Sequence, residues 1–570
     1  MPTITPRDFS SADAEALSGN GVHPVLARVY AARGIQSARQ LEYDLKGLLP
    51  YAELKNAGQM ATRLADAIAA KARLLVIADY DSDGATACAV ALRALRAFGA
   101  TVDYLVPNRF EYGYGLTPEI VRLAAERRPD ILLTVDNGIA SVAGVAEANR
   151  LGMQVLVTDH HLPGDELPDA ACIVNPNQPG CEFPDKHLAG VGVIFYVMLA
   201  LRAELRQRDA FSGKTEPNLA QLLDLVALGT MADVVALDHH NRTLVSNGLK
   251  RIQNGKASVG IQALLKVAGR DVRRASTWDL GFALGPRLNA AGRMEDMALG
   301  IECLLCDDPA QALELAQQLD ALNRERRATE AEMLESTEVK ALTEKLAASH
   351  ALDTPRSSLA LFDPDWHQGV IGILASRLKD KHHRPVIAFA RGNDGELKGS
   401  GRSIPGFHLR DALDLVSKQN PGLIGKFGGH AMAAGLSIAE AAFPHFQAAF
   451  ESTCGALLTP ALLTRVIATD GELEVRELTL ELAQLLRDEV WGQAFPQPEF
   501  CGTFEVEQQR VVGEKHLKLR LGLTGHSFEA MLFFHAEPLP KRLRAVYRPD
   551  ANEYNGNVTL QLLISHWEPE

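Results

Sequence analysis

The sequence lacks a long hydrophobic run, a low-complexity tract and an extended block of like charge. Its longest apolar stretch, residues 188–201, is shorter than the roughly 18 residues that cross a bilayer. It therefore predicts a buried helix. The first residues carry no basic segment followed by an apolar one, so no secretory signal is expected. These absences predict a chain that folds throughout and stays in the cytoplasm, with no membrane partner.

Cysteines are few, and their spacing does not suggest disulfide pairs. Seven cysteines are dispersed along 570 residues, as expected where thiols stay reduced. Cys303 and Cys306 have the spacing of half a zinc site, but no second matching pair follows, and the residues between them favour a helix. We interpret both as packing residues.

An excess of positive charge is also missing. Lysine and arginine number 58 against 71 acidic residues, a net charge of -13, which argues against a general polyanion binder. Divalent cations bound among clustered acidic residues would nevertheless reverse the local field, so that a phosphate meets a positive charge. Metal-dependent phosphoester chemistry therefore stays open.

The length exceeds one hydrophobic core, and about 150 residues per domain suggests roughly three or four domains. Changes of pattern along the chain divide it into an extension, a catalytic α/β domain, a connector helix, a smaller α/β domain and a barrel. The predicted ranges, in that order, are 1–50, 51–300, 301–350, 351–455 and 460–570.

The first α/β domain alternates apolar strands with helices. Strands are predicted at 74–78, 102–106, 131–135, 155–157 and 172–174, and helices at 85–98, 117–127 and 139–151. This alternation predicts a doubly wound parallel sheet covered on both faces. Ligands of such sheets bind beyond the carboxyl ends of the strands.

A charged, glycine-free helix over 308–348 predicts a connector to a second α/β unit. That unit has strands at 359–362 and 386–389, a helix at 370–378, and two glycine-rich loops. The loops, 399–403 and 428–430, would let backbone N–H groups approach an oxyanion.

The last part of the chain predicts a small barrel. Short alternating strands lie at 503–506, 517–521, 528–534, 543–547 and 558–564, which suits a five-stranded oligonucleotide-binding barrel. Its basic lining would comprise Lys515, Lys518, Arg520, Lys541, Arg542, Arg544 and Arg548. Phe533, Phe534 and Tyr547 are available for base stacking, although core packing is favoured for each.

Acidic residues and histidines gather where predicted strands end. The clusters are Asp79 to Asp83, Asp136 and Asp159 to His161, and Asp233 follows a helix over 222–228. This donor set suits a pair of divalent cations with open positions for water and phosphate. Single aspartates after strands often cap helices, but this conjunction rarely arises from capping. It predicts a two-metal phosphodiesterase site.

Within this site Asp81 and Asp83 would face one crevice, and Asp136 is the expected bridge between two metals. His160 and His161 are adjacent, so an extended backbone would point them to opposite sides. We assign His160 to a metal and His161 to the scissile phosphate.

Asp233, expected on a loop after its helix, would complete the second metal shell. Asp238-His239-His240 repeats the letters of the earlier cluster without following a parallel strand. We interpret it as a surface turn, because such short motifs often match by chance.

Seven segments carry a family resemblance. They are Ala78–Gly84, Asn108–Gly115, Asp136–Ile139, Thr158–His161, Gly229–Asp233, Gly285–Arg293 and Gly428–Gly435. The chain is identified from them as a member of the DHH phosphoesterase superfamily. Over nearly its whole length it resembles the exonucleases of that superfamily that act on single-stranded DNA.

The resemblance implies a DHH catalytic domain, a DHHA1-like second domain and an oligonucleotide-binding barrel. It implies removal of nucleotides from the 5′ end of single-stranded DNA in repair and recombination. Two Mn²⁺ or Mg²⁺ ions would be bound by residues matching Asp81, Asp83, Asp136, His160 and Asp233, with Asp79 in the same cluster. A single-strand-binding protein is the implied partner, and a monomer is expected.

Residues outside the acidic clusters are assigned to phosphate. Arg109, Arg287, Ser400 and Arg402 would bind the terminal and neighbouring phosphates, because guanidinium forks suit oxyanions. His430 in its glycine-rich loop would assist. Each arginine could instead join the two α/β domains through a carboxylate pair.

Three alternative functions remain. A small-substrate DHH hydrolase would have little use for the barrel, and a non-catalytic DNA-binding scaffold would not need the intact acidic set. A nuclease that prefers RNA is not distinguished by the pocket residues.

Overall fold

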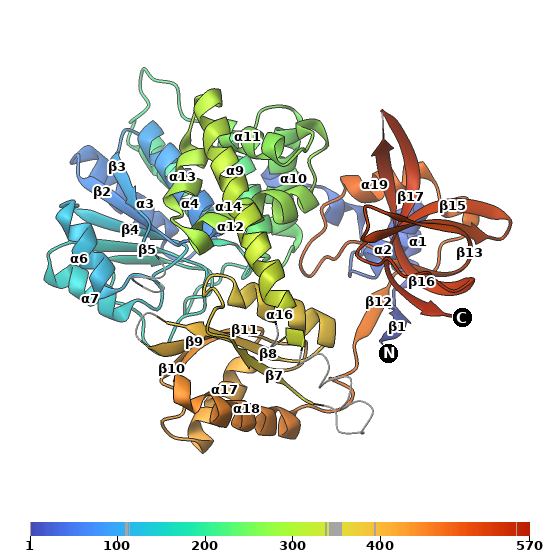
Figure 1. Cartoon of the computed structure of the whole chain (residues 1–570). Coiled ribbons are helices and arrows are strands. Elements are labelled where there is room, and N and C mark those ends of the chain that lie inside the picture. Colours follow the sequence, from blue (N-terminus) through green and yellow to red (C-terminus); the bar gives the residue numbers. More distant parts are fainter. Residues whose placement is uncertain are drawn as a thin grey trace. The chain divides into compact units, whose positions relative to one another are not determined.

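The computed structural model describes residues 2–108, 112, 115–336, 339–340, 356–392, 395–554 and 556–570 (Figure 1). The chain forms two compact units. The larger comprises residues 6–320 and 468–570, and the smaller comprises the residues up to Thr5 together with 321–467.

The larger unit contains the predicted parallel sheet. Its strand order is β3-β2-β4-β5-β6, and every neighbouring pair is parallel. The strands are β2 (Arg73–Ala78), β3 (Thr101–Leu105), β4 (Ile131–Val135), β5 (Gln154–Thr158) and β6 (Cys172–Val174). All five residues of β4 are buried, which explains its continuous apolar run. The predicted fold class is confirmed.

Helices cover both faces of this sheet (Figure 1). One face packs against α6 (Pro118–Glu126) and α7 (Val142–Arg150), whose Ile120, Val121 and Val145 join the core beneath β2, β4 and β5. On the other side lie α3 (Ala57–Ala69), α4 (Ser82–Ala97) and α8 (Gly190–Gln207). The apolar run at 188–201 therefore forms a buried helix, as predicted.

The strand order reverses between β2 and β4. The chain leaves β2 for β3 on one side and then returns to place β4 on the other. Ala78 pairs with Val135, and Val135 pairs with Thr158, so the carboxyl ends of β2, β4 and β5 are level with one another. Ligands of open α/β sheets bind at such a switch point. The acidic clusters follow these same three residues.

A helical region completes this part of the larger unit. Its elements are α9 (Leu223–Asp233), α10 (His239–Gln253), α11 (Val259–Val267), the π-helix η6 (Asp279–Leu284), α12 (Gly285–Met294) and α13 (Ala298–Leu305). The long helix α14 (Pro309–Glu335) begins in the larger unit and ends in the smaller. The rest of the helix predicted to reach residue 348 lies largely outside the described residues.

The barrel also belongs to the larger unit. It is closed, with strand order β13-β14-β15-β17-β16. The strands are β13 (Phe500–Val512), β14 (His516–Leu523), β15 (His526–Leu532), β16 (Arg542–Tyr554) and β17 (Asn557–Pro569). The predicted five-stranded barrel is confirmed.

The three barrel aromatics divide between core and surface. Tyr547 is buried, as favoured from the sequence, but Phe533 and Phe534 are 48% and 83% exposed. Both follow the end of β15, where the strand no longer places alternate residues inside. The preference for core packing was therefore wrong for these two.

The amino-terminal helices α1 (Ser11–Gly19) and α2 (Pro24–Ala31) pack against each other, and α2 lies beside the segment that leads into the barrel. The Tyr30 ring stacks on Trp491 and Phe495. Close by, Arg33 Nη1 lies 2.5 Å from Asp470 Oδ1, and both side chains are almost fully buried. The helix α19 (Leu480–Asp488) completes this region.

The smaller unit holds a mixed sheet of order β10-β11-β9-β8-β7. Its strands are β7 (Leu359–Phe362), β8 (Val386–Arg391), β9 (Glu396–Arg402), β10 (Lys426–Gly429) and β11 (Ala433–Ala439). The helices are α16 (Ile371–His382), α17 (Leu409–Gln419) and α18 (Phe443–Leu457). A ribbon of β1 (Thr3–Pro6) and β12 (Val466–Thr469) adjoins it along the chain.

The two glycine-rich loops predicted in this unit are mostly strands. Residues 399–402 lie in β9, and Gly428 and Gly429 end β10. A Cβ on Gly399 would lie 2.5 Å from the Phe389 ring, so this glycine makes room for packing across the sheet. Glycine content alone could not distinguish that need from a loop.

Within the described ranges, no helix is both long enough and apolar enough to span a membrane.

The buried Arg33–Asp470 pair yields a stability prediction. Arg33→Met leaves the Asp470 carboxylate buried with less compensation, so it should lose roughly 3–5 kcal/mol of unfolding free energy for this region. Hydrogen exchange of α1, α2 and the residues before β13 measures the loss. Arg33→Met combined with Asp470→Leu should recover part of it, and an unchanged exchange pattern in the single variant would refute the role of this pair.

Candidate metal centre

The first acidic cluster follows β2 and opens α4. Asp81 caps this helix, and its Oδ1 accepts a hydrogen bond from Gly84 N at 3.0 Å. A Cβ on Gly84 would lie 2.5 Å from the backbone oxygen of Asp79, so only glycine allows this close turn. Asp79 is itself buried. Asp81 therefore does cap a helix, as the alternative to a metal-binding role requires. The cap uses only one of its carboxylate oxygens, so the other could still bind a metal.

Asp83 is fixed by the start of α8. Its Oδ2 accepts from Gly190 N at 2.7 Å and its Oδ1 accepts from Val191 N at 2.9 Å. The amino terminus of a helix favours a negative charge, because its first N–H groups have no partner within the helix. Gly229 packs against Asp83 so closely that a Cβ there would lie 3.0 Å from Asp83 Oδ1. The Asp83 carboxylate is thus fully buried and is held in place by two backbone N–H groups.

Asp136 lies directly after β4 in a left-handed backbone conformation, with φ of 61°. This conformation is unfavourable for residues other than glycine and recurs at functional sites. A Cβ on Gly190 would lie 2.5 Å from Asp136 Oδ1. The same glycine therefore leaves room for Asp136 and donates to Asp83.

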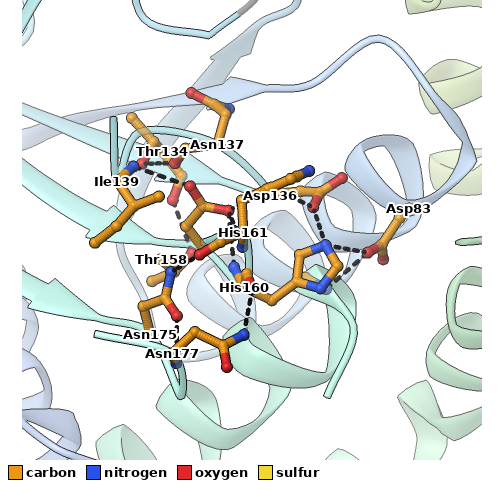
Figure 2. A network of polar contacts seen from close by, with 12 residues as sticks. Asp83, Thr134, Asp136, Asn137, Ile139, Thr158, His160, His161, Asn175 and Asn177 are labelled. Carbon is orange, nitrogen blue, oxygen red and sulfur yellow. Dashed lines mark hydrogen bonds and ion pairs between the residues drawn. The ribbon is translucent and has the colours of Figure 1, made fainter. Parts of the chain in front are cut away.

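His160 points at these carboxylates, as Figure 2 shows. Its Nε2 lies 3.2 Å from Asp136 Oδ1, 3.6 Å from Asp233 Oδ2 and 3.9 Å from Asp83 Oδ2. Asp233 is the last residue of α9, which corrects its expected place on a following loop. The helix continues beyond the predicted end because Gly229 and Thr230 are buried against α4 and α8.

His161 has a different partner. Its Nδ1 lies 2.8 Å from Asp159 Oδ1, which also accepts from the backbone of His160 and His161. The two rings meet edge to face, 4.6 Å apart, and His161 Nδ1 is still within 4.0 Å of Asp136 Oδ1. The expectation that the adjacent histidines point to opposite sides was wrong, because the chain is no longer extended after β5. The assignment of His160 to a metal and His161 to a phosphate stays a prediction.

Several residues that position the site had no predicted role. Asp159 Oδ2 accepts from Ile139 N at 2.9 Å, and Asn175 and Asn177 donate to the backbone oxygens of His161 and His160. Asn289 in α12 accepts from Ser82 N at 2.8 Å. Asn175 and Asn177 follow β6. A search for polar residues directly after each predicted strand, which identified the acidic clusters, would therefore have identified them too.

Two buried ligand atoms test whether the residues suit a metal. Asp136 Oδ1 and His160 Nε2 find no hydrogen-bond partner in the described part of the chain. Buried polar atoms in folded proteins almost always have one. Ligand atoms within 4.8 Å of one another form three groups: Asp79, Asp81 and Asp136; Asp83, His160 and Asp233; Asp136, His160 and His161. Oxygen donors with one or two imidazoles fit Mn²⁺ or Mg²⁺.

The charges agree with this interpretation. Burial, followed by repulsion from neighbouring aspartates, raises the pKa of Asp79, Asp83 and Asp136 well above the usual value. Burial also raises the pKa of Asp233 and lowers that of His160, which favours the neutral imidazole that ligates a metal.

The pKa values of Asp159 and His161 shift in directions opposite to those of the other aspartates and of His160. Burial opposes the His161 imidazolium, but the hydrogen bond and charge of Asp159 outweigh it and raise the pKa of His161 to about 9. Burial likewise opposes the Asp159 carboxylate, but His161 outweighs it and lowers the pKa of Asp159.

The second Asp-His-His sequence lies elsewhere and is not a surface turn. Asp238 caps α10, and His240 is buried, with its Nε2 2.9 Å from Tyr196 Oη. Burial lowers the pKa of His240 to about 4. The letters repeat because an aspartate cap precedes this helix, and His240 belongs to its buried face.

The predicted phosphate-binding residues belong to both units of the chain. Arg287 in α12 lies 2.8 Å from Asp320 in α14, which is the kind of carboxylate pair that competes with a phosphate role. Ser400 and Arg402 lie in β9, where Arg402 Nη1 donates to Ser400 Oγ at 3.2 Å, and His430 follows β10. These three belong to the smaller unit, whereas the acidic groups belong to the larger. Arg109 lies outside the described residues.

Comparison with known proteins supports the class that this site indicates. The family model of the DHH family N-terminal domain matches residues 73–230, and that of the DHHA1 domain matches 356–456. The chain thus combines a DHH-family domain, which holds most of the acidic centre, with a DHHA1 domain. The model of the RecJ OB domain matches residues 469–566, which contain all of the closed barrel except the end of β17.

Individual relatives narrow the class. The single-stranded-DNA-specific exonuclease RecJ of Dickeya dadantii is 52% identical over 556 residues, covering 96% of each chain. RecJ of Bacillus subtilis is 33% identical and covers 96% of this chain and 69% of its own length. The crystal structure of Thermus thermophilus RecJ in complex with Mn²⁺ matches with a TM-score of 0.80 at 31% identity, covering 100% of this chain and 79% of that one. The chain belongs to the RecJ family.

Gly190 gives a local test of the site. Gly190→Ala places a methyl group against Asp136, so it should weaken Mn²⁺ binding on the order of 10- to 100-fold, as displaced supporting groups do elsewhere. Calorimetric titration measures the affinity. Gly58→Ala in α3 is the matched control, because nothing lies within 4 Å of a Cβ there. Equal affinity in both variants would contradict the proposed crowding.

The raised carboxyl pKa values predict an unusual pH dependence of the metal-free protein. Folded-state values above the unfolded value of about 3.9 mean that the folded chain binds more protons, so stability falls as pH rises above that value toward the folded values. Melting with a chelator should therefore show a carboxyl contribution to Tm that is lost as the pH rises above about 4, and Mn²⁺ should remove most of that loss. Asp136→Asn should flatten the metal-free slope and abolish the Mn²⁺ effect; a slope unchanged by this variant would exclude Asp136 as its source.

Proposed function

We propose that this chain is a metal-dependent exonuclease that hydrolyses the phosphodiester bonds of single-stranded DNA from the 5′ end and releases nucleotides. The observation that carries the proposal is the pair of buried, unsatisfied ligand atoms, Asp136 Oδ1 and His160 Nε2, only 3.2 Å apart. The RecJ relatives supply the substrate class, because they are named single-stranded-DNA-specific exonucleases.

Two divalent ions would be held by neighbouring groups of this site. Asp79, Asp81 and Asp136 suit one, and Asp83, His160 and Asp233 suit the other. Asp136 would bridge them, since it lies beside both sets. Mn²⁺ and Mg²⁺ are the candidates, because Thermus thermophilus RecJ has been crystallised in complex with each of them. Such ions, when bound, activate a water molecule and neutralise charge on the phosphate and on the leaving oxygen.

The chain's own residues would position the reaction. The N–H groups of Gly190 and Val191 hold the Asp83 carboxylate, and Asn177 holds the backbone beside His160. Asp159 holds the His161 ring and favours its charged form, which suits contact with a scissile phosphate oxygen. His161 would then bind the substrate, and His160 a metal.

The phosphate-binding assignments of Arg109, Arg287, Ser400, Arg402 and His430 remain proposals. Arg287 would need to exchange Asp320 for a phosphate, or to use its remaining N–H groups. Ser400 and Arg402 already contact each other, as two members of one anion site would.

The barrel would bind the strand beyond the reacting end. Lys518, Arg520 and Arg542 form ion pairs with Glu529, Glu507 and Glu570. Within the described part of the barrel, Lys515, Lys541, Arg544 and Arg548 form no ion pair, and Arg548 donates to Gln497, so the first three are the better candidates for DNA phosphates. Exposed Phe533 and Phe534 offer ring faces to bases. A small-substrate hydrolase would not need this surface.

A role in DNA repair and recombination, a cytoplasmic location, a monomeric state and association with a single-strand-binding protein remain predictions from the sequence.

Digestion of a strand labelled at either terminus tests the proposal. The enzyme should release label first from the 5′ end of single-stranded DNA, and a chelator should abolish release. Asp136→Ala should lower kcat by at least roughly 1,000-fold without loss of folding, because it removes the bridging ligand. A matched RNA strand and a duplex complete the assay. Preference for RNA, release from the 3′ end, or an active Asp136→Ala would each contradict the assignment.

A further inference from the structure

Two stacked aromatic side chains lie exposed at the beginning of the helix that supports the metal centre. Trp278 is 43% exposed and Phe282 is 69% exposed. Their ring centroids are 5.7 Å apart, with 29° between the planes. Aromatic rings of this size are usually buried, and a contiguous exposed pair marks a binding surface more often than a lone exposed residue does.

The pair is held in a fixed position. The Arg270 guanidinium lies 4.8 Å from the centre of the Trp278 ring, and Arg270 Nε lies 3.2 Å from Asp279 Oδ1. Asp279 also accepts hydrogen bonds from Ser276 at the start of the turn. Phe282 belongs to η6, which continues into α12, and π-helical segments often occur at functional sites. Phe282 is the more exposed of the two rings, so it presents the larger open face.

The chain around this pair runs from the barrel to the metal centre. At one end Arg274 forms an ion pair with Glu553 of the barrel strand β16. At the other, Asn289 accepts from Ser82 N beside Asp81 and Asp83. Between them a Cβ on Gly285 would lie 3.1 Å from Ala232, the residue before Asp233. Along the chain the aromatic pair therefore lies between a contact with the barrel hairpin and a contact with the metal centre.

We propose that Phe282, supported by Trp278 and Arg270, stacks on a base of the single strand between the barrel and the metal centre. This inference rests on the proposed nuclease function. Stacking accepts every base, because each has a π-face, so it suits an enzyme that degrades strands without sequence preference. A base inside a duplex already has both faces covered by its neighbours. The aromatic pair therefore favours single strands over duplex independently of any restriction on width.

The test uses the full-length enzyme with Mn²⁺ and a set of 5′-phosphorylated strands. Each strand carries one abasic residue, moved one position at a time from the 5′ end. Wild-type enzyme should show a rise in KM of about 5- to 100-fold at one or two positions, the usual range for loss of one base stack. Phe282→Ala should show that loss with the intact strand and no further loss with an abasic residue at those positions.

Two further variants separate stacking from a general effect on folding. Phe282→Tyr keeps an aromatic face and should retain the wild-type abasic pattern. Phe9→Ala removes a 44% exposed aromatic ring far along the sequence and should leave KM unchanged. Thermal melting of all variants checks the fold.

A wild-type KM that is the same at every abasic position, with normal cleavage of intact DNA, overturns the stacking proposal and leaves the nuclease assignment standing. So does an abasic pattern in Phe282→Ala identical to that of the wild type, which would indicate that another class of partner covers this surface. Failure of the wild-type enzyme to cleave any strand instead overturns the proposed function itself.

Discussion

The structure is organised around a concentration of buried negative charge that the protein alone does not neutralise. Asp79, Asp83 and Asp136 are buried together, and burial and mutual repulsion raise the pKa of all three. Placing carboxylates this close opposes folding unless protons or cations occupy the site. The hydrogen bonds of α8 to Asp83, the left-handed backbone of Asp136 and the close-packed glycines all maintain an arrangement whose charge must be relieved by protons or by bound cations.

The neighbouring Asp159–His161 pair shows how one fold keeps two adjacent histidines chemically distinct. His160 faces the aspartates that would ligate a metal, and its burial favours the neutral imidazole. His161 instead forms a hydrogen bond with Asp159. One imidazole is thus suited to coordination and the other to contact with an oxyanion. The difference arises from the turn after β5 and its two supporting asparagines, not from the residue type.

Much of this could be read from the sequence, because the strongest signals are local. Apolar strands followed by Asp79 to Asp83, Asp136 and Asp159 to His161 predicted both the parallel sheet and the residues that meet at its edge. What failed depended on contacts distant in sequence. Gly399 clears space for Phe389 across a sheet, His240 is buried against Tyr196, and α9 extends to Asp233 because α4 and α8 cover it. Periodicity and composition carry no record of such partners.

The hydrogen bonds from α8 to Asp83 join residues 107 and 108 positions apart in the chain. During synthesis, the first acidic cluster emerges long before the helix that orients it, and Asp233 emerges later still. A chain that ends before α8 and α9 therefore cannot form the complete group of Asp83, His160 and Asp233, although it already contains several of the aspartates. Binding of a divalent cation at these groups would therefore be a late event that requires a correctly packed domain, and a truncated or misfolded copy would lack the complete site.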